Sequence, residues 1–151
     1  MARIPTFYRV AFTWFDVLIS AGTAVMAYAR PQIFTEMYVR SMVAHTEEIA
    51  VVIWCIGAMF AYHAIIQGVV LRYTDDLRVW KASQFATLVL DWQMVFILYA
   101  AAQRQGTLDP ASWTANDWGS WILTAGVIVI RTMFLLDVGI AKEAQLAKKV
   151  A

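Results

Sequence analysis

Residues 49–71 read IAVVIWCIGAMFAYHAIIQGVVL, and this stretch decides the fold because it contains no Asp, Glu, Lys or Arg. A helix rises about 1.5 Å per residue, so a run of this length crosses the roughly 30 Å hydrocarbon core of a bilayer. Three further apolar stretches of similar length lie at 7–29, 79–102 and 118–141. Membrane-spanning strands would be about half as long and would alternate polar with apolar residues, so we predict four transmembrane helices.

The composition of the whole chain agrees with this prediction. Of its 151 residues, 61% are hydrophobic and 15% are charged, whereas soluble domains average about 45–50% apolar and about 25% charged residues. A soluble domain of this size cannot bury so much apolar side chain. The sequence therefore predicts a single all-α domain, 1–151, that forms a four-helix transmembrane bundle in the lipid bilayer.

Net charge and cysteine content exclude several classes of protein. The formal net charge is +1, which argues against a nucleic-acid partner, because such proteins need a basic face. The single cysteine, Cys55, excludes an internal disulfide and a cysteine-rich metal site. The spacing of the polar residues matches no specific metal site, and we predict neither a metal nor a cofactor.

Basic residues predict the orientation of the bundle, because they are enriched in the cytoplasmic segments of membrane proteins. Eight of them fall at the two ends and in the second connection: Arg3, Arg9, Arg72, Arg78, Lys81, Lys142, Lys148 and Lys149. Three fall in the other two connections: Arg30, Arg40 and Arg104. We therefore predict that both termini face the cytosol.

Each predicted span carries an ionisable side chain that lipid would reject. Counted from the nearest cytosolic basic residue at 1.5 Å per residue, Asp16 lies about 10 Å deep and His63 about 13 Å deep. Asp91 and Arg131 lie about 15 and 16 Å deep by the same count. A charge at the bilayer centre costs at least about 2.5–3.5 kcal/mol, so such residues face the bundle interior and pair with one another. Their common depth predicts one shared site, in a hydrated pocket open to the cytosol.

Asp16, Asp91 and Arg131 are the predicted catalytic residues. A guanidinium group can hold one carboxylate ionised while burial and like-charge repulsion keep the other protonated, which provides a general base and a general acid. The pair suits epoxide opening, in which the acid protonates the epoxide oxygen and the base activates water or a substrate hydroxyl. An Asp–Arg–Asp set serves one class of soluble epoxide hydrolases with another fold, so this comparison is chemical only. The alternative is a buried ion pair that fixes the helix register.

Further polar and aromatic side chains are predicted to contact a substrate. His63 can move a proton or bind substrate, and Gln67 and Gln84 can orient water, although hydrogen bonds between helices are an equally good interpretation of all three. Trp14 and Tyr62 can line an apolar pocket, whereas the alternative for both is contact with lipid or with neighbouring helices.

Four segments resemble a family of small fungal four-span membrane proteins: FYRVAFTWFD (7–16), LRYTDDLRVW (71–80), LVLD (88–91) and RTMF (131–134). These proteins are found in polyketide and terpenoid biosynthetic clusters, including the aurovertin and citreoviridin type, where a small membrane hydrolase or cyclase is thought to open polyether epoxides. The resemblance implies a lipophilic natural-product substrate and a location in an internal membrane, the endoplasmic reticulum. The family often has Pro after the first-span Asp. Val17 stands there in this chain, which predicts a straighter helix.

Two alternatives from other classes remain open. A sterol-isomerase-like or lipid- or sterol-binding membrane protein would carry out no hydrolysis, and its product would contain no oxygen from water. A non-catalytic accessory subunit would have its polar residues packed together without a cavity, and mutations in them would lower stability. The sequence also leaves homo-oligomerisation open.

Overall fold

A computed structural model describes residues 4–38 and 46–140, and within these ranges the chain forms helices and no strands. The first span consists of α1 (Thr6–Val10), the π-helical turn η1 (Ala11–Phe15) and α2 (Asp16–Ala29). The second is α4 (Glu47–Gly68), which the short 3₁₀ turn η2 (Val70–Arg72) continues. The third and fourth are α5 (Leu77–Gln105) and α6 (Ala115–Leu135). All four are long and apolar enough to cross a membrane, which agrees with the predicted spans.

Local capping explains where most of these helices begin. The Thr46 hydroxyl accepts a hydrogen bond from the Ile49 amide at 3.4 Å, and the Asp76 carboxylate accepts one from the Arg78 amide at 2.8 Å. Both side chains satisfy backbone donors that a first helical turn leaves without partners. Thr114 caps α6 in the same way.

The structure departs from the predicted boundaries in two places. The fourth helix ends at Leu135, not at 141, because Asp137 and Gly139 adopt left-handed backbone angles that break it. Residue 141 itself lies outside the described residues. The connection between the first two spans contains a helix that the sequence did not predict, α3 (Pro31–Tyr38). Proline at its first position is favourable there, because that amide needs no helical partner.

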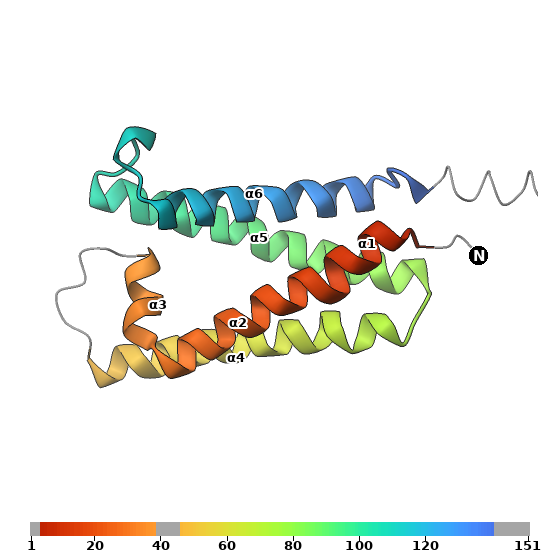
Figure 1. The fold of residues 1–151 in the computed structure, drawn as a ribbon, viewed down its shortest axis with the longest axis horizontal. Helices are drawn as coiled ribbons and strands as arrows, with labels where there is room; N and C mark the ends of the chain where they lie inside the picture. The colour runs from red at the N-terminus through yellow and green to blue at the C-terminus, as the bar shows by residue number, and fades with distance from the viewer. Residues whose placement is uncertain (1–3, 39–45, 141–151) are drawn as a thin grey trace, which may run out of the picture.

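The helices form two pairs, with α2 against α4 and α5 against α6 (Figure 1). The first pair packs closely because Gly57 has no side chain, and a Cβ placed there would lie 3.0 Å from the Cβ of Ala27. The first span leans between the pairs, so that Tyr8 packs against Phe134 of α6 while Ala27 lies beside α4. This inclination brings the middle of the first span between α4 and α6.

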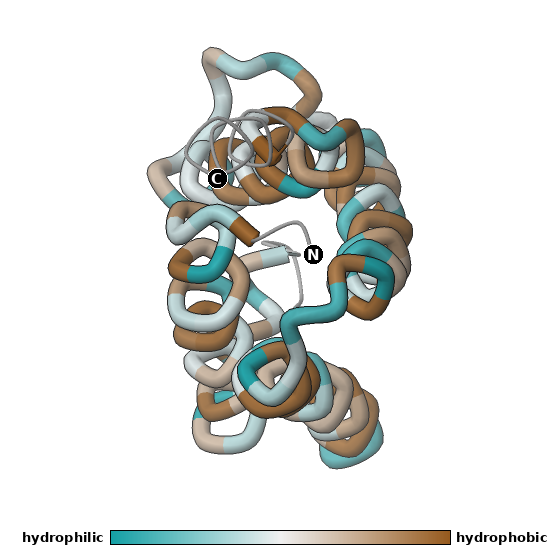
Figure 2. The backbone as a smooth tube through the Cα atoms, turned by 90° about the vertical axis from the view of Figure 1, so that its right-hand side faces the viewer, coloured by the Kyte–Doolittle hydropathy of each residue, from teal (hydrophilic) through white to brown (hydrophobic). Residues whose placement is uncertain are grey.

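Aromatic and aliphatic side chains close one end of the bundle. A buried cluster, which we call the aromatic plug, contains Ile4, Tyr8, Phe12, Leu71, Trp80, Phe134 and Ile140. Because it includes both the first and the last described residues, both ends of the described chain lie at this end of the bundle. Figure 2 looks along the helices from this end and shows hydrophobic residues on every span. Many of them face outward, as expected for side chains that contact lipid.

Candidate functional site

Arg131 lies at the centre of a polar cluster in the bundle interior. Its side chain is buried on α6, and its Nη2 donates to Oδ2 of Asp16 at 2.5 Å. Its Nη1 donates to Oδ2 of Asp91, and its Nε donates to Oε1 of Gln84 at 3.1 Å. One guanidinium therefore connects α2, α5 and α6. The planar fork of arginine suits this task, because it presents several donors in fixed directions.

His63 joins the cluster from α4, the second span. One of its ring nitrogens, Nε2, lies 3.3 Å from Oδ2 of Asp16. The same carboxylate oxygen therefore contacts both His63 and Arg131. The structure thus brings together the four ionisable side chains that the sequence placed at one depth, one from each span.

Two glutamines extend the cluster toward the aromatic plug. Gln84 Nε2 donates to Oε1 of Gln67 at 2.8 Å, and Gln67 Nε2 donates to the Thr87 hydroxyl at 3.1 Å. All three side chains are buried. Thr87 was missed by the sequence reasoning, although it lies between Gln84 and Asp91 at helical spacings of three and four, which place all three on one face of α5.

The charges of the cluster do not balance. Asp16 and Asp91 supply two negative charges when ionised and Arg131 supplies one positive charge, so a neutral His63 leaves one negative charge in excess. Such an excess is costly at this depth in a membrane, and uptake of one proton by the cluster removes it. The cluster is therefore able to hold one exchangeable proton, which acid–base chemistry requires.

Exposure distinguishes the members of the cluster. The side chains of Arg131 and Asp16 are 2% and 9% exposed, whereas those of Asp91 and His63 are 15% and 16% exposed. Asp91 contacts Arg131 through Oδ2, and its Oδ1 has no hydrogen bond to another described residue. Asp91 and His63 thus form the more accessible edge of the cluster.

The structure does not place Trp14 and Tyr62 in this site. Their side chains are 57% and 67% exposed on the outer surface of the bundle, where lipid would contact them. The guanidinium of Arg72 instead lies over the Trp14 ring, with its carbon 4.3 Å from the ring centre. The sequence prediction that these two rings line a substrate pocket is therefore wrong. Aromatic residues fill every span, and their spacing alone does not distinguish inner from outer faces.

The predicted opening at the end with both termini is closed. Phe134 of the aromatic plug packs edge to face with Phe12 and at a tilt against Trp80, and the hydroxyl of Tyr8 donates to the Val138 carbonyl at 2.8 Å. At the same end, Lys81 Nζ donates to Oδ2 of Asp137 at 2.7 Å. The plug and its polar rim separate the cluster from this end of the bundle.

The cavity beside the cluster is small. It measures about 10 Å³ and is lined by Ala11, Phe12, Phe15, Asp16, Val127, Ile130 and Arg131. About 10–15 Å³ is needed for one water molecule, so this cavity holds one water at most. This cavity is therefore not the large hydrated pocket that the sequence predicts, and it lies beside Asp16 and Arg131, whereas the more accessible side chains are Asp91 and His63.

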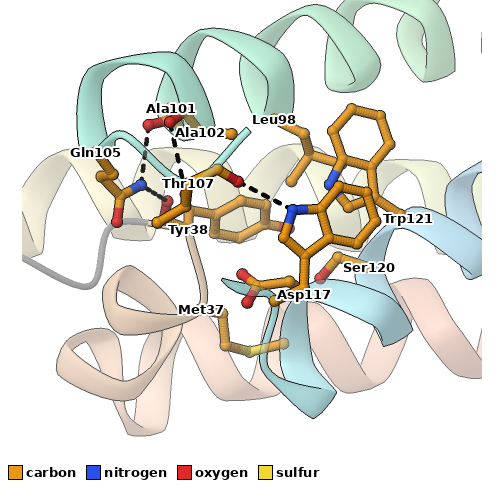
Figure 3. Close-up of a pocket in the computed structure, with 11 residues that line it drawn as sticks. Met37, Tyr38, Leu98, Ala101, Ala102, Gln105, Thr107, Asp117, Ser120 and Trp121 are labelled. Carbon is orange, nitrogen blue, oxygen red and sulfur yellow. Dashed lines mark hydrogen bonds between the residues drawn. The ribbon is translucent and has the colours of Figure 1, made fainter. Parts of the chain in front are cut away.

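A second pocket of about 20 Å³ lies at the opposite end of the bundle, between α3, α5, the segment 106–114 and α6 (Figure 3). Gln105 Nε2 donates to the carbonyls of Tyr38 and Ala101, and Trp113 Nε1 donates to the Thr107 carbonyl. Burial raises the pKa of the Tyr38 phenol. These contacts tie the connections together, and no three His, Cys, Asp or Glu side chains among the described residues are placed so that they could hold a metal ion.

Comparison with known proteins gives a family but no activity. No curated protein and no solved structure matches the chain. A family model described as a domain of unknown function, DUF7704, matches residues 1–141. Because this match covers most of the chain, the protein belongs to the DUF7704 family.

Proposed function

We propose that the protein is an intramembrane epoxide-opening enzyme, a hydrolase or cyclase, that acts on a lipophilic natural-product intermediate by carboxylate acid–base catalysis. The observation that carries this proposal is the bridge from Asp16 through Arg131 to Asp91 inside the bundle. Ionisable residues at this depth are costly and are usually functional. The resemblance to membrane proteins of fungal polyketide and terpenoid clusters supplies the substrate class.

The chemistry needs one proton donor and one proton acceptor on opposite sides of the epoxide. The acceptor takes a proton from water while the water oxygen forms a bond to an epoxide carbon. The carbon–oxygen bond of the ring breaks, and the donor protonates the released oxygen, which gives a diol. If a hydroxyl of the substrate replaces water, the same steps give a cyclic ether. The cluster gives up one proton and takes up one, so its charge is unchanged.

The geometry favours different roles for the two carboxylates. Asp16 is the more buried one and is held by both Arg131 and His63, which suits the ionised carboxylate that accepts the proton from water. Asp91 lies at the more accessible edge and has a carboxylate oxygen without a described partner, which suits the group that exchanges a proton with substrate or water. Gln84 holds Arg131 through its Nε, and Gln67 in turn accepts a hydrogen bond from Gln84.

In this proposal the protein lies in the endoplasmic reticulum membrane with both termini in the cytosol. The distribution of basic residues, eight against three, supports that orientation. The aromatic plug then faces the cytosol, and the accessible edge of the cluster faces the membrane interior. A lipophilic substrate dissolved in the bilayer would thus reach the cluster without crossing the plug.

The test is turnover of lipophilic epoxides in ¹⁸O-labelled water by the protein in lipid nanodiscs. We expect labelled diol, or an unlabelled cyclic ether where the substrate carries a hydroxyl, and we expect Asp91→Asn to lower turnover at least about 100-fold, as for loss of a general acid or base. Asp137→Asn is the matched control, because Asp137 lies outside the cluster and asparagine tolerates its left-handed backbone. Wild-type turnover in Asp91→Asn contradicts the proposal, and an unlabelled product that retains the epoxide ring indicates an isomerase.

One observation favours a second candidate, a non-catalytic accessory subunit. The cavity beside the cluster is about 10 Å³, so the polar side chains are packed together as that function predicts. Under this alternative, Asp91→Asn would change the stability of the protein or its association with a partner enzyme, and no epoxide would be consumed by the isolated wild-type protein. The nanodisc assay separates the two candidates directly.

A further inference from the structure

The π-helical turn η1 ends directly before Asp16. The backbone is helical on both sides of it, at Val10 and at Asp16, so the first span continues through the turn without a break. Turns of this kind are rare, and they occur frequently at functional sites. Val17 predicts a straighter helix than in the family that the chain resembles, and the sequence carries no signal for the turn.

The turn corrects the direction of Asp16. Four side chains that follow one another at intervals of four residues are all buried: Tyr8, Phe12, Asp16 and Ser20. In an α-helix each step of four residues overshoots a full turn by about 40°, so Asp16 would lie about 80° away from the direction of Tyr8. A π turn holds one additional residue, which removes about 100° of rotation. Residues of the plug and Asp16 thereby share one face of the span.

Arg72 contacts this turn at two consecutive residues. Its Nη2 donates to the Thr13 carbonyl at 2.7 Å, and its guanidinium carbon lies 4.3 Å from the ring centre of Trp14. Arg72 comes from η2 at the end of the second span, 59 residues away along the chain. A backbone oxygen in a membrane helix needs a donor from within the protein, and stacking on an aromatic ring holds the guanidinium in place.

We propose that Arg72 is a positioning residue: it stabilises the π turn and thereby directs Asp16 toward Arg131 and His63. The geometric part stands on the contacts of Arg72 alone, whereas its consequence for turnover rests on the proposed function. Arg72 touches neither Asp16 nor Arg131 in any described contact, so its effect on the cluster passes through the backbone of residues 11–15.

The test measures the contact between Asp16 and His63 by solid-state NMR in lipid bilayers. The chain has two histidines, and His45→Gln leaves His63 as the single imidazole. With ¹⁵N-histidine and ¹³C-carboxyl aspartate, dipolar dephasing then reports the 3.3 Å contact with Asp16, and Asp16→Asn gives the background level. We expect Arg72→Met to reduce dephasing to that level. Arg78→Met is the control, since Arg78 is an exposed arginine close in sequence with no described ion pair, and it should match the parent protein.

Full dephasing in a folded Arg72→Met variant overturns the proposal. If Arg72→Met does not fold, Arg72→Lys decides: lysine keeps the charge but lacks the planar group that both stacks on Trp14 and donates to Thr13. Intermediate dephasing in Arg72→Lys supports the positioning role. Full dephasing in Arg72→Lys overturns it, because Arg72 would then only anchor the span. Because this measurement needs no substrate, a negative result rejects the positioning role of Arg72 without bearing on the proposed epoxide-opening activity. If turnover is found, Arg72→Lys should lower kcat with little change in KM.

Discussion

Replacing Arg131 with methionine tests whether the guanidinium holds the bundle interior together. Methionine is long and unbranched, so it fills much of the same space without a charge. The substitution removes the donors to Asp16, Asp91 and Gln84 in one step. It leaves two carboxylates and an amide oxygen facing each other inside the bundle.

The structure sets the expected size of the effect. Removing one partner of a buried ion pair costs about 3–5 kcal/mol, because the remaining charge is buried without compensation. The Gln84 oxygen, left without its donor, adds a penalty of about 1–3 kcal/mol. These terms are not additive, since protonation of one carboxylate relieves part of the strain. We therefore expect the free energy of unfolding to fall by about 4 kcal/mol.

The assay is reversible unfolding in mixed detergent micelles, followed by circular dichroism. A triple variant, Arg131→Met with Asp16→Asn and Asp91→Asn, removes all three charges and should recover most of the lost stability. Arg78→Met serves as the control, because it removes an exposed arginine and should change the free energy of unfolding by about 0.5 kcal/mol or less.

Two results would refute the reasoning. The free energy of unfolding of Arg131→Met could lie within about 1 kcal/mol of the wild-type value, which is the loss expected for an exposed ion pair. The triple variant could also be as unstable as Arg131→Met alone. Either result would mean that the two carboxylates do not depend on the guanidinium for their compensation.

Three further predictions concern other parts of the bundle. Gly57→Val should lower the free energy of unfolding by about 1–3 kcal/mol in the same assay, because its side chain meets Ala27, whereas Gly126→Ala, in open space, should be neutral or slightly stabilising. Asp76→Ala should cost about 1 kcal/mol through loss of the α5 cap, and Asp76→Asn should cost less. Burial raises the pKa of Tyr38, so the folded state retains this proton when the unfolded state releases it. Stability should therefore fall as pH rises above about 10, and an equal fall in Tyr38→Phe would refute this assignment.

The spans and the composition of the cluster could be predicted from the sequence because both depend on position along the chain. Apolar length determines which segments cross a membrane, and residue count from a basic anchor determines depth. Asp16, His63, Asp91 and Arg131 were found in this way, one on each helix. The caps at Thr46 and Asp76 also depend only on local sequence, because each joins residues two or three positions apart.

Other features of the site could not be predicted, because they depend on how each helix is rotated about its axis. Trp14 and Tyr62 face outward while Phe12 and Trp80 face inward, yet all four are aromatic residues in or beside apolar stretches. In lipid, hydrophobicity does not distinguish the two faces, since the outer surface is as apolar as the core. The same ambiguity concealed the closed plug and the small size of the cavity.

The sequence by itself determined that four helices are long and apolar enough to cross a membrane and that each carries an ionisable residue at a similar position along its length. Only the tertiary structure decided that the guanidinium of Arg131 joins Asp16 and Asp91. It also decided that an aromatic plug closes one end and that a π turn contacted by Arg72 precedes Asp16. The physical reason is that depth follows from the rise per residue along one helix. Direction follows from contacts between helices that are far apart in the chain.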